Sequence, residues 1–289
     1  MAITTKMTFA FLTIISFIFN LFGAPGYPTS KTVDLDNFTL VWSDEFEGDS
    51  VDYETWNAGW WGNENTMVRK GGWWNSKLAS VKDGCLHIAT RYYENGIDND
   101  GNSGWYSTQL TTEKSYSQKY GYFEVRCILP EGAGLWSAFW MMCSGVSDVG
   151  QDGKDGSEID IFESAYYSDA RYRNTVSSAV HFDGYGEAHR SKQVHQTHVY
   201  GSDPYKEFNT YGVEWNSDGY TFYINGHKCG FSNFGGVSQV PEYLLLSVEV
   251  GGDNGVPSQS WAGPSIETNN FAPTDFIVDY VRAYQYNNR

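Results

Sequence analysis

The residue pattern that most constrains the fold is a series of short β-branched or aromatic segments, each bounded by Gly, Asn, Asp or Pro. Such segments are typical of β-strands joined by tight turns. Asn225-Gly226 directly follows one of them and is a strong signal for a two-residue hairpin turn. No amphipathic helix of useful length is evident, so an all-β sandwich of two antiparallel sheets is predicted. We predict strands over 33–35, 40–42, 85–90, 121–129, 137–142, 158–163, 177–182, 211–215, 220–224, 244–250 and 276–285.

Charge and aromatic content narrow the class of partner. The 289 residues include 19 basic and 35 acidic side chains, a formal net charge of -16. A field of this sign repels phosphate backbones, which excludes nucleic acid as a partner and favours neutral over acidic glycans. Aromatic residues make up 17% of the chain, with 11 Trp and 21 Tyr. Flat apolar faces beside hydrogen-bonding groups are what sugar rings require of a binding surface.

The first residues have the pattern of a secretory signal. Lys6 precedes an apolar run over 9–22, and Gly23-Ala24 follows it. We predict a signal peptide over 1–24, with cleavage between 24 and 30, and a secreted protein without membrane association after its removal. An uncleaved signal anchor is the alternative, although the run is short for a membrane span. No linker, repeat or charge block divides the chain over 31–289, so we expect a single domain there and a monomer.

Secretion makes the cysteines candidates for disulfide bonds. Four cysteines allow three pairings, and the sequence does not choose among them. Their spacing lacks any C-x-x-C pair, so a zinc site is not expected. Two of them lie in strand-like segments and could equally be buried thiols. The residues concerned are Cys85, Cys127, Cys143 and Cys229.

The segment with the most chemical information is Glu158-Ile159-Asp160-Ile161-Phe162-Glu163. Residues two apart in a strand share a face, so Glu158 and Asp160 point the same way and Glu163 points the other way. A β-bulge around Ile161-Phe162 would return Glu163 to the face of the first two acids. The two glutamate Cα atoms would then lie ~13 Å apart, and side chains leaning together would leave roughly 5 Å between their carboxyl groups. That separation suits a retaining glycosidase better than an inverting one.

Three acids on one face of an apolar strand indicate a functional site. Like charges this close raise the pKa of at least one carboxyl, and one protonated acid beside one carboxylate is what double displacement at a sugar carbon requires. The alternatives are a calcium-binding patch or an exposed acidic strand. The alternating isoleucines argue against a solvated strand, and calcium sites more often use Asp-rich loops.

The segment from Glu158 to Glu163 resembles the E-x-D-x-x-E signature of glycoside hydrolase family 16 in its bulged, laminarinase-like form. Further segments fit the same family in the same order: 42–46, 120–126, 134–141 and 278–282. The resemblance implies a β-jelly-roll of the concanavalin A type with a substrate cleft on its concave face. It also implies Glu158 as nucleophile, Glu163 as general acid/base and Asp160 as their helper, with no cofactor for catalysis.

The same resemblance suggests residues that bind substrate. Two tryptophans four apart share a strand face and are either stacking platforms or core residues, and the family favours the cleft. A same-face Glu–Arg pair matches one that hydrogen-bonds sugar hydroxyls in related β-glucanases, with a surface salt bridge as the alternative. A loop asparagine and a histidine resemble cleft residues of laminarinases, although a lone histidine is as often structural. These expected binding residues are Trp136, Trp140, Glu124, Arg126, Asn63 and His181.

The family also implies a structural Ca²⁺ on the far side of the fold. The matching positions are Asp279, through its side chain, and Glu45 and Gly84, through backbone oxygens. Ligation by oxygen alone fits calcium. The alternative is that Asp279 simply ends a strand.

The expected activity is endo-hydrolysis of β-1,3 or mixed β-1,3-1,4 glucan. The bulged branch of the family also includes red-algal galactan hydrolases, and a transglycosylase that rebuilds glucan would use the same residues. A non-catalytic glucan-binding protein is a third alternative. It is disfavoured because such relatives lose one or both catalytic glutamates, and this sequence retains both.

Overall fold

The computed structural model describes residues 30–58, 66–99, 101–268 and 272–287. The predicted signal segment over 1–24 and Asn63 lie outside these described residues. Within the described ranges, no helix combines the length and the apolar character that a bilayer crossing needs.

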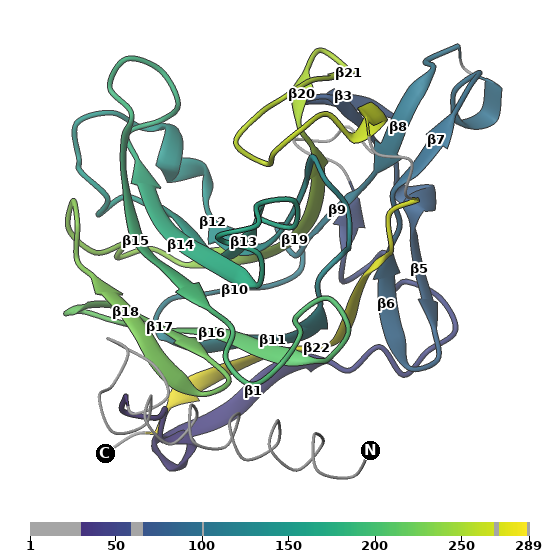
Figure 1. Cartoon of the computed structure of the whole chain (residues 1–289). Coiled ribbons are helices and arrows are strands. Elements are labelled where there is room, and N and C mark those ends of the chain that lie inside the picture. The colour runs from purple at the N-terminus through teal and green to yellow at the C-terminus, as the bar shows by residue number, and fades with distance from the viewer. Residues whose placement is uncertain (1–29, 59–65, 100, 269–271, 288–289) are drawn as a thin grey trace, which may run out of the picture.

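Two large antiparallel sheets are stacked face to face (Figure 1). The sheet that we call the convex sheet has the order β18-β17-β16-β11-β22-β6-β5, with β1 also paired to β22. The sheet that we call the concave sheet has the order β15-β14-β13-β12-β19-β9-β2, with β10 also paired to β19. The expected sandwich of two antiparallel sheets is therefore confirmed.

The convex sheet consists of β1 (Phe38–Asp44), β5 (Ala79–Lys82), β6 (Cys85–Ile88), β11 (Gly121–Ile128), β16 (Asn209–Asn216), β17 (Gly219–Ile224), β18 (His227–Ser232) and β22 (Phe276–Tyr286). The concave sheet consists of β2 (Asn57–Ala58), β9 (Gln109–Thr111), β10 (Ser117–Gln118), β12 (Leu135–Met142), β13 (Glu158–Ser164), β14 (Thr175–Phe182), β15 (Arg190–His198) and β19 (Glu242–Val250). A small sheet of β3 (Met67–Arg69), β4 (Gly72–Trp74), β7 (Arg91–Tyr93) and β8 (Gly104–Ser107) lies beside them, with the hairpin of β20 (Gly252–Asp253) and β21 (Val256–Pro257). Short 3-10 turns cover Leu35–Asn37, Ser76–Leu78, Ile97–Asn99, Ser144–Ser147 and Ile266–Thr268.

The main core fills the space between the two large sheets. Phe123 and Val125 of β11 join Ile159 and Phe162 of β13 in one buried cluster. Burial of each such side chain stabilises the fold by roughly 1.5–3 kcal/mol. Because strand residues alternate between faces, Glu158 and Asp160 of β13 point away from this core, onto the open side of the concave sheet.

Turn chemistry and strand pattern explain where the sequence prediction succeeded and failed. Asn225 and Gly226 have φ values of 49° and 74°, as a hairpin turn between β17 and β18 requires, so that prediction is confirmed. The predicted strand over 33–35 is wrong, because a 3-10 turn begins at Leu35. β15 was missed because its polar, largely exposed edge sequence lacks apolar alternation.

All four cysteines are free thiols. Cys127 is fully buried in the core, and burial raises the pKa of its thiol well above the ordinary value. Cys229 Sγ lies 3.2 Å from His195 Nε2. The alternative of buried thiols therefore holds in this structure for Cys85 and Cys127.

Candidate active site

A β-bulge in β13 brings three acids onto one face. Asp160 pairs with Ala179 of β14 and Glu163 pairs with Ser177, so three steps along β13 match two along β14. The register with β12 shifts at the same place. Ile161 and Phe162 both turn into the core, and the bulge expected there is confirmed. Glu158, Asp160 and Glu163 consequently line the same cavity on the open side of the concave sheet.

Two adjoining cavities form a cleft across this face. Their volumes are about 480 and about 460 Å³. Both are lined by Glu158 and Glu163, so the cleft extends to either side of the two glutamates. A polymer that is cut internally must be held on both sides of the reacting bond, and this arrangement provides for that.

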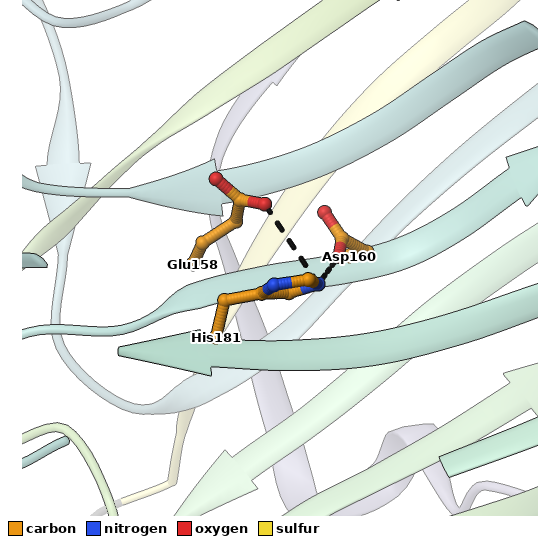
Figure 2. A group of neighbouring side chains, drawn as sticks. All are labelled: Glu158, Asp160 and His181. Atoms are coloured by element: carbon orange, nitrogen blue, oxygen red, sulfur yellow. Dashed lines mark ion pairs between the residues drawn. The ribbon is translucent and has the colours of Figure 1, made fainter. Parts of the chain in front are cut away.

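Asp160 and His181 form an ion pair beside Glu158. His181 of β14 lies directly opposite Glu158 in the strand register. Its Nε2 is 3.2 Å from Asp160 Oδ2 and 4.0 Å from Glu158 Oε1. Figure 2 shows the three side chains turned toward one another, with an ion pair from the imidazole to each of the two carboxyl groups. His181 thus lines the cavity beside two of the three acids and is not an isolated core histidine.

Two further residues come from the connection between β14 and β15, and sequence reasoning missed both. The Tyr185 hydroxyl donates a hydrogen bond to Glu158 Oε2. His189 Nε2 is 2.9 Å from His181 Nδ1, and the two ring planes are nearly parallel, with an interplanar angle of 10°. Both follow Glu158 at a distance along the chain, in a polar loop without a motif, so spacing alone could not have placed them.

The electrostatic surroundings distinguish the two glutamates. Burial, and then the charges of Asp160 and Glu158, raise the pKa of Glu163 well above its ordinary value. Burial and the charge of Asp160 also raise the pKa of Glu158, to about 7, but His181 and the Tyr185 hydroxyl oppose that rise. Burial alone would lower the pKa of His181, yet its contact with Asp160 and that residue's charge raise it to about 9. Of the two glutamates, Glu163 thus has the surroundings that more strongly favour the protonated form, whereas His181 and Tyr185 favour the carboxylate form of Glu158.

Aromatic side chains form part of the cleft floor. Trp136 and Trp140 of β12 both line it, although each is largely buried. Trp140 Nε1 donates a hydrogen bond to Ser247 Oγ at 3.1 Å. The Trp136 ring packs against Trp261, whose side chain is about half exposed at the edge of the second cavity. Their ring faces are thus placed beside the polar groups that a sugar would contact.

A buried ion pair supports the other wall. Arg69 of β3 donates to Glu249 Oε1 of β19 through Nε at 3.0 Å and through Nη2 at 2.7 Å. Both residues line the first cavity. The position of Glu249 follows from its shared strand face with Ser247, whereas Arg69 lies in a short strand that the sequence did not reveal.

The structure does not bring Glu124 and Arg126 to the cleft, so their expected role in sugar binding is wrong. Both belong to β11 of the convex sheet, where Phe123 and Val125 face the core and these two face outward. Glu124 accepts hydrogen bonds from two tyrosine hydroxyls, those of Tyr122 at 2.6 Å and Tyr280 at 2.8 Å. Their strand alternation was correct, but alternation cannot tell which of two sheets a strand joins.

The expected calcium ligands do not fit a calcium ion. Arg126 Nη1 forms an ion pair with Asp279 Oδ2, so a guanidinium neutralises the side-chain carboxylate of the predicted set. Gly84 occupies a hairpin turn at φ 73°. A second cation beside Arg126 would be repelled, and hard cations need several free oxygens.

Comparison with known proteins agrees with this geometry. A family model described as Beta-porphyranase A-D, GH16 domain, matches residues 39–286. Glucan endo-1,3-beta-glucosidase A1 of Niallia circulans is 27% identical over 285 residues, covering 90% of this chain and 39% of that protein. Endo-1,3-1,4-beta-glycanase ExsH of Rhizobium meliloti is 29% identical over 206 residues, covering 71% of this chain and 39% of that protein.

A solved structure shares the fold over most of its length. The catalytic domain of an endo-1,3-beta-glucanase (laminarinase) from Thermotoga petrophila superposes with a TM-score of 0.68 at 28% identity, covering 87% of this chain and 99% of that chain. The present chain spans about two fifths of the length of the curated relatives named above.

Proposed function

The chain belongs to glycoside hydrolase family 16, and from that premise we propose that it is a retaining endo-β-glucanase acting on internal β-1,3 or mixed β-1,3-1,4 linkages. The observation that carries the proposal is the bulge that places Glu158 and Glu163 in one cleft. The named activities of the curated relatives and of the solved laminarinase domain support the choice of substrate.

The proposed reaction uses only carboxyl groups of the chain. Glu163 begins protonated and donates its proton to the leaving glycosidic oxygen while Glu158 attacks the anomeric carbon. The ionised Glu163 then deprotonates the water that hydrolyses the glycosyl-enzyme. Asp160 and His181 orient Glu158 throughout, and Trp136 and Trp140 offer ring faces to the sugars.

The setting of the enzyme is part of the same proposal. We infer a secreted protein whose signal segment over 1–24 is removed and whose residues 31–289 act as one monomeric catalytic domain. The signal-like composition of 1–24 and the family match over 39–286 support these boundaries.

A second candidate is hydrolysis of a red-algal galactan. The description of the matching family model favours it. Lys70, which lines both cavities, forms no ion pair with any residue that the structure describes, and such a cation could meet a sulfate ester on the substrate. The glucanase remains the first candidate because the curated relatives and the solved structure named above are glucanases or glycanases.

The test is an incubation of the full chain with laminarin, lichenan, agarose and porphyran, followed by sizing of the oligosaccharide products. We expect laminarin or lichenan to release short oligosaccharides fastest, with a rapid fall in viscosity that marks internal cleavage. Dominant release from agarose or porphyran would replace the glucanase by the second candidate. Longer products at high oligosaccharide concentration would instead indicate a transglycosylase.

A further inference from the structure

Three side chains of the cleft have the spacing of metal ligands. Glu158, Asp160 and His181 each offer one ligand atom, and these atoms all lie within 4.8 Å of one another. A tetrahedral ion with bonds of ~2.0–2.2 Å holds neighbouring ligand atoms roughly 3.3–3.6 Å apart. The distances from His181 Nε2, 3.2 Å to Asp160 and 4.0 Å to Glu158, lie on either side of that range. The third separation, between the Glu158 and Asp160 oxygens, is at most 4.8 Å, so the ligand atoms would draw together by up to ~1 Å around an ion.

The atoms behind these ligands are already held in the manner of a metal site. His181 Nδ1 is engaged by His189, which leaves Nε2 directed at the two carboxyl groups. Tyr185 donates to Glu158 Oε2, which leaves Oε1 on the side of the imidazole. In zinc sites the second nitrogen of a ligating histidine and the second oxygen of a carboxylate are fixed by such outer contacts.

Asp160 is a buried carboxylate that faces the other two ligands. It is only 4% exposed, and its buried Oδ2 accepts no hydrogen bond from any residue that the structure describes. The partner of that oxygen in this part of the chain is the imidazole of His181, through an ion pair. The imidazolium of His181 compensates Asp160 through this ion pair. A divalent ion that displaces the proton of Nε2 would bind both groups and leave one more positive charge beside the three ligands.

We propose that Glu158, Asp160 and His181 bind a divalent transition-metal ion of the Zn²⁺ class, and that this ion reversibly blocks the site. One imidazole nitrogen, two carboxylate oxygens and a fourth position open to the cleft suit Zn²⁺. Mg²⁺ and Ca²⁺ prefer six or more oxygen ligands and do not suit it. The blocking effect rests on the proposed function, because the ion would occupy the oxygen with which Glu158 attacks the sugar. Binding of the ion does not depend on that function.

Binding is tested by isothermal titration of Zn²⁺ into the chelator-treated full chain, purified without a histidine tag. We expect one ion per chain. His181→Gln removes a ligand and should weaken binding by ~100-fold or more, and His189→Gln removes only the outer support and should weaken it by ~10-fold. The matched control is His198→Gln, an exposed histidine on β15 outside the cleft, which should bind Zn²⁺ like the wild type.

Inhibition is tested on the wild type and on His189→Gln with a laminarin oligosaccharide. Zn²⁺ should raise the apparent KM while kcat stays unchanged, EDTA should restore the rate, and Mg²⁺ at the same concentration should have no effect. His189→Gln should require about tenfold more Zn²⁺ for the same inhibition.

The two arms separate the two proposals. The metal site is overturned if the wild type binds no Zn²⁺ stoichiometrically, or if His181→Gln binds it as tightly as the wild type. Stoichiometric Zn²⁺ binding without any loss of hydrolysis would overturn the blocking of the nucleophile. A chain that hydrolyses no glycan but loses Zn²⁺ binding on His181→Gln would overturn the proposed function and support the metal site.

Discussion

The two outer faces of the sandwich both carry acids at alternate strand positions, yet they satisfy them differently. On the convex side, Arg282 of β22 donates to both oxygens of Glu45, which directly follows β1, at 2.9 and 2.8 Å, and lowers the pKa of that carboxyl. On the concave sheet, Glu158 and Glu163 have their pKa values raised by burial and by neighbouring acids. Strand alternation decides which acids share a face, but the supply of partners decides whether an acid is structural or reactive.

The largest difference between the faces should appear on removing one acid from each. Glu158→Ala deletes the proposed nucleophile and should lower kcat by ~10⁴-fold or more, as measured by reducing-sugar release from laminarin. Azide should restore turnover of an activated glycoside and give a product of inverted configuration, because the small anion occupies the vacated space.

The matched change on the convex side is Glu45→Gln. It breaks a partly exposed ion pair with Arg282 and should cost at most ~1 kcal/mol of the free energy of unfolding, with kcat unaltered. Near-native hydrolysis by Glu158→Ala would remove the distinction between the faces.

A smaller loss of kcat is expected when Glu163, the proposed general acid, is replaced. Glu163→Gln keeps the size of the side chain but cannot transfer a proton, so kcat should fall by ~10²–10⁴-fold for natural glucan. An aryl glycoside with a good leaving group should be affected far less in its first step, which burst kinetics would measure. Glu124→Gln should leave kcat intact and lower stability by ~1–3 kcal/mol through its tyrosine hydrogen bonds. Equal losses in the first-step rate with natural glucan and with the aryl glycoside would argue against Glu163 as the acid.

A buried acid outside the cleft should affect the stability of the fold and its dependence on pH. Glu242 is fully buried and accepts the Ser157 backbone N–H at 3.0 Å. Burial raises the pKa of Glu242 to about 8, so the folded protein keeps a proton that the unfolded chain loses above its ordinary pKa of about 4.5. The free energy of unfolding should therefore fall as pH rises from about 4.5 to about 8, by at most ~1.4 kcal/mol per pH unit. Urea unfolding at pH 5 and pH 8 measures this.

The contribution of that single group is isolated by Glu242→Gln. The amide keeps an acceptor for Ser157 but does not ionise, so the loss of stability between pH 5 and pH 8 should be smaller in the variant. An unchanged difference would assign the pH dependence to other groups.

The smallest effect is expected from calcium. Because Arg126 already pairs with Asp279, neither added Ca²⁺ nor EDTA should shift the thermal unfolding midpoint of the wild type. A midpoint that rises with Ca²⁺ concentration would contradict this picture of the convex face and would restore the ligand set that the family resemblance implied.

The fold and the centre of the site could be predicted because they depend on local patterns. Apolar alternation identified β11, β13 and β19, and counting acids along 158–163 required the bulge that the register of β13 shows. Both inferences use only the period of a strand and the position of an apolar face.

The rest depends on contacts between residues far apart in the sequence. Tyr185 and His189 lie in an irregular polar loop, and Arg69 meets Glu249 across 180 positions. Glu124 was misplaced because β11 carries the same alternation as a cleft strand but belongs to the other sheet. No local pattern contains that information.

The most direct test of double displacement is the anomeric configuration of the first product, followed by proton NMR during cleavage of a β-linked glucan oligosaccharide by the wild type. If Glu158 attacks the sugar and water then displaces it, the β-configuration is retained. We therefore expect the β-anomer to appear first and then to mutarotate to the equilibrium mixture. Initial appearance of the α-anomer would mean that water attacks directly, and would contradict the roles of Glu158 as nucleophile and Glu163 as general acid/base.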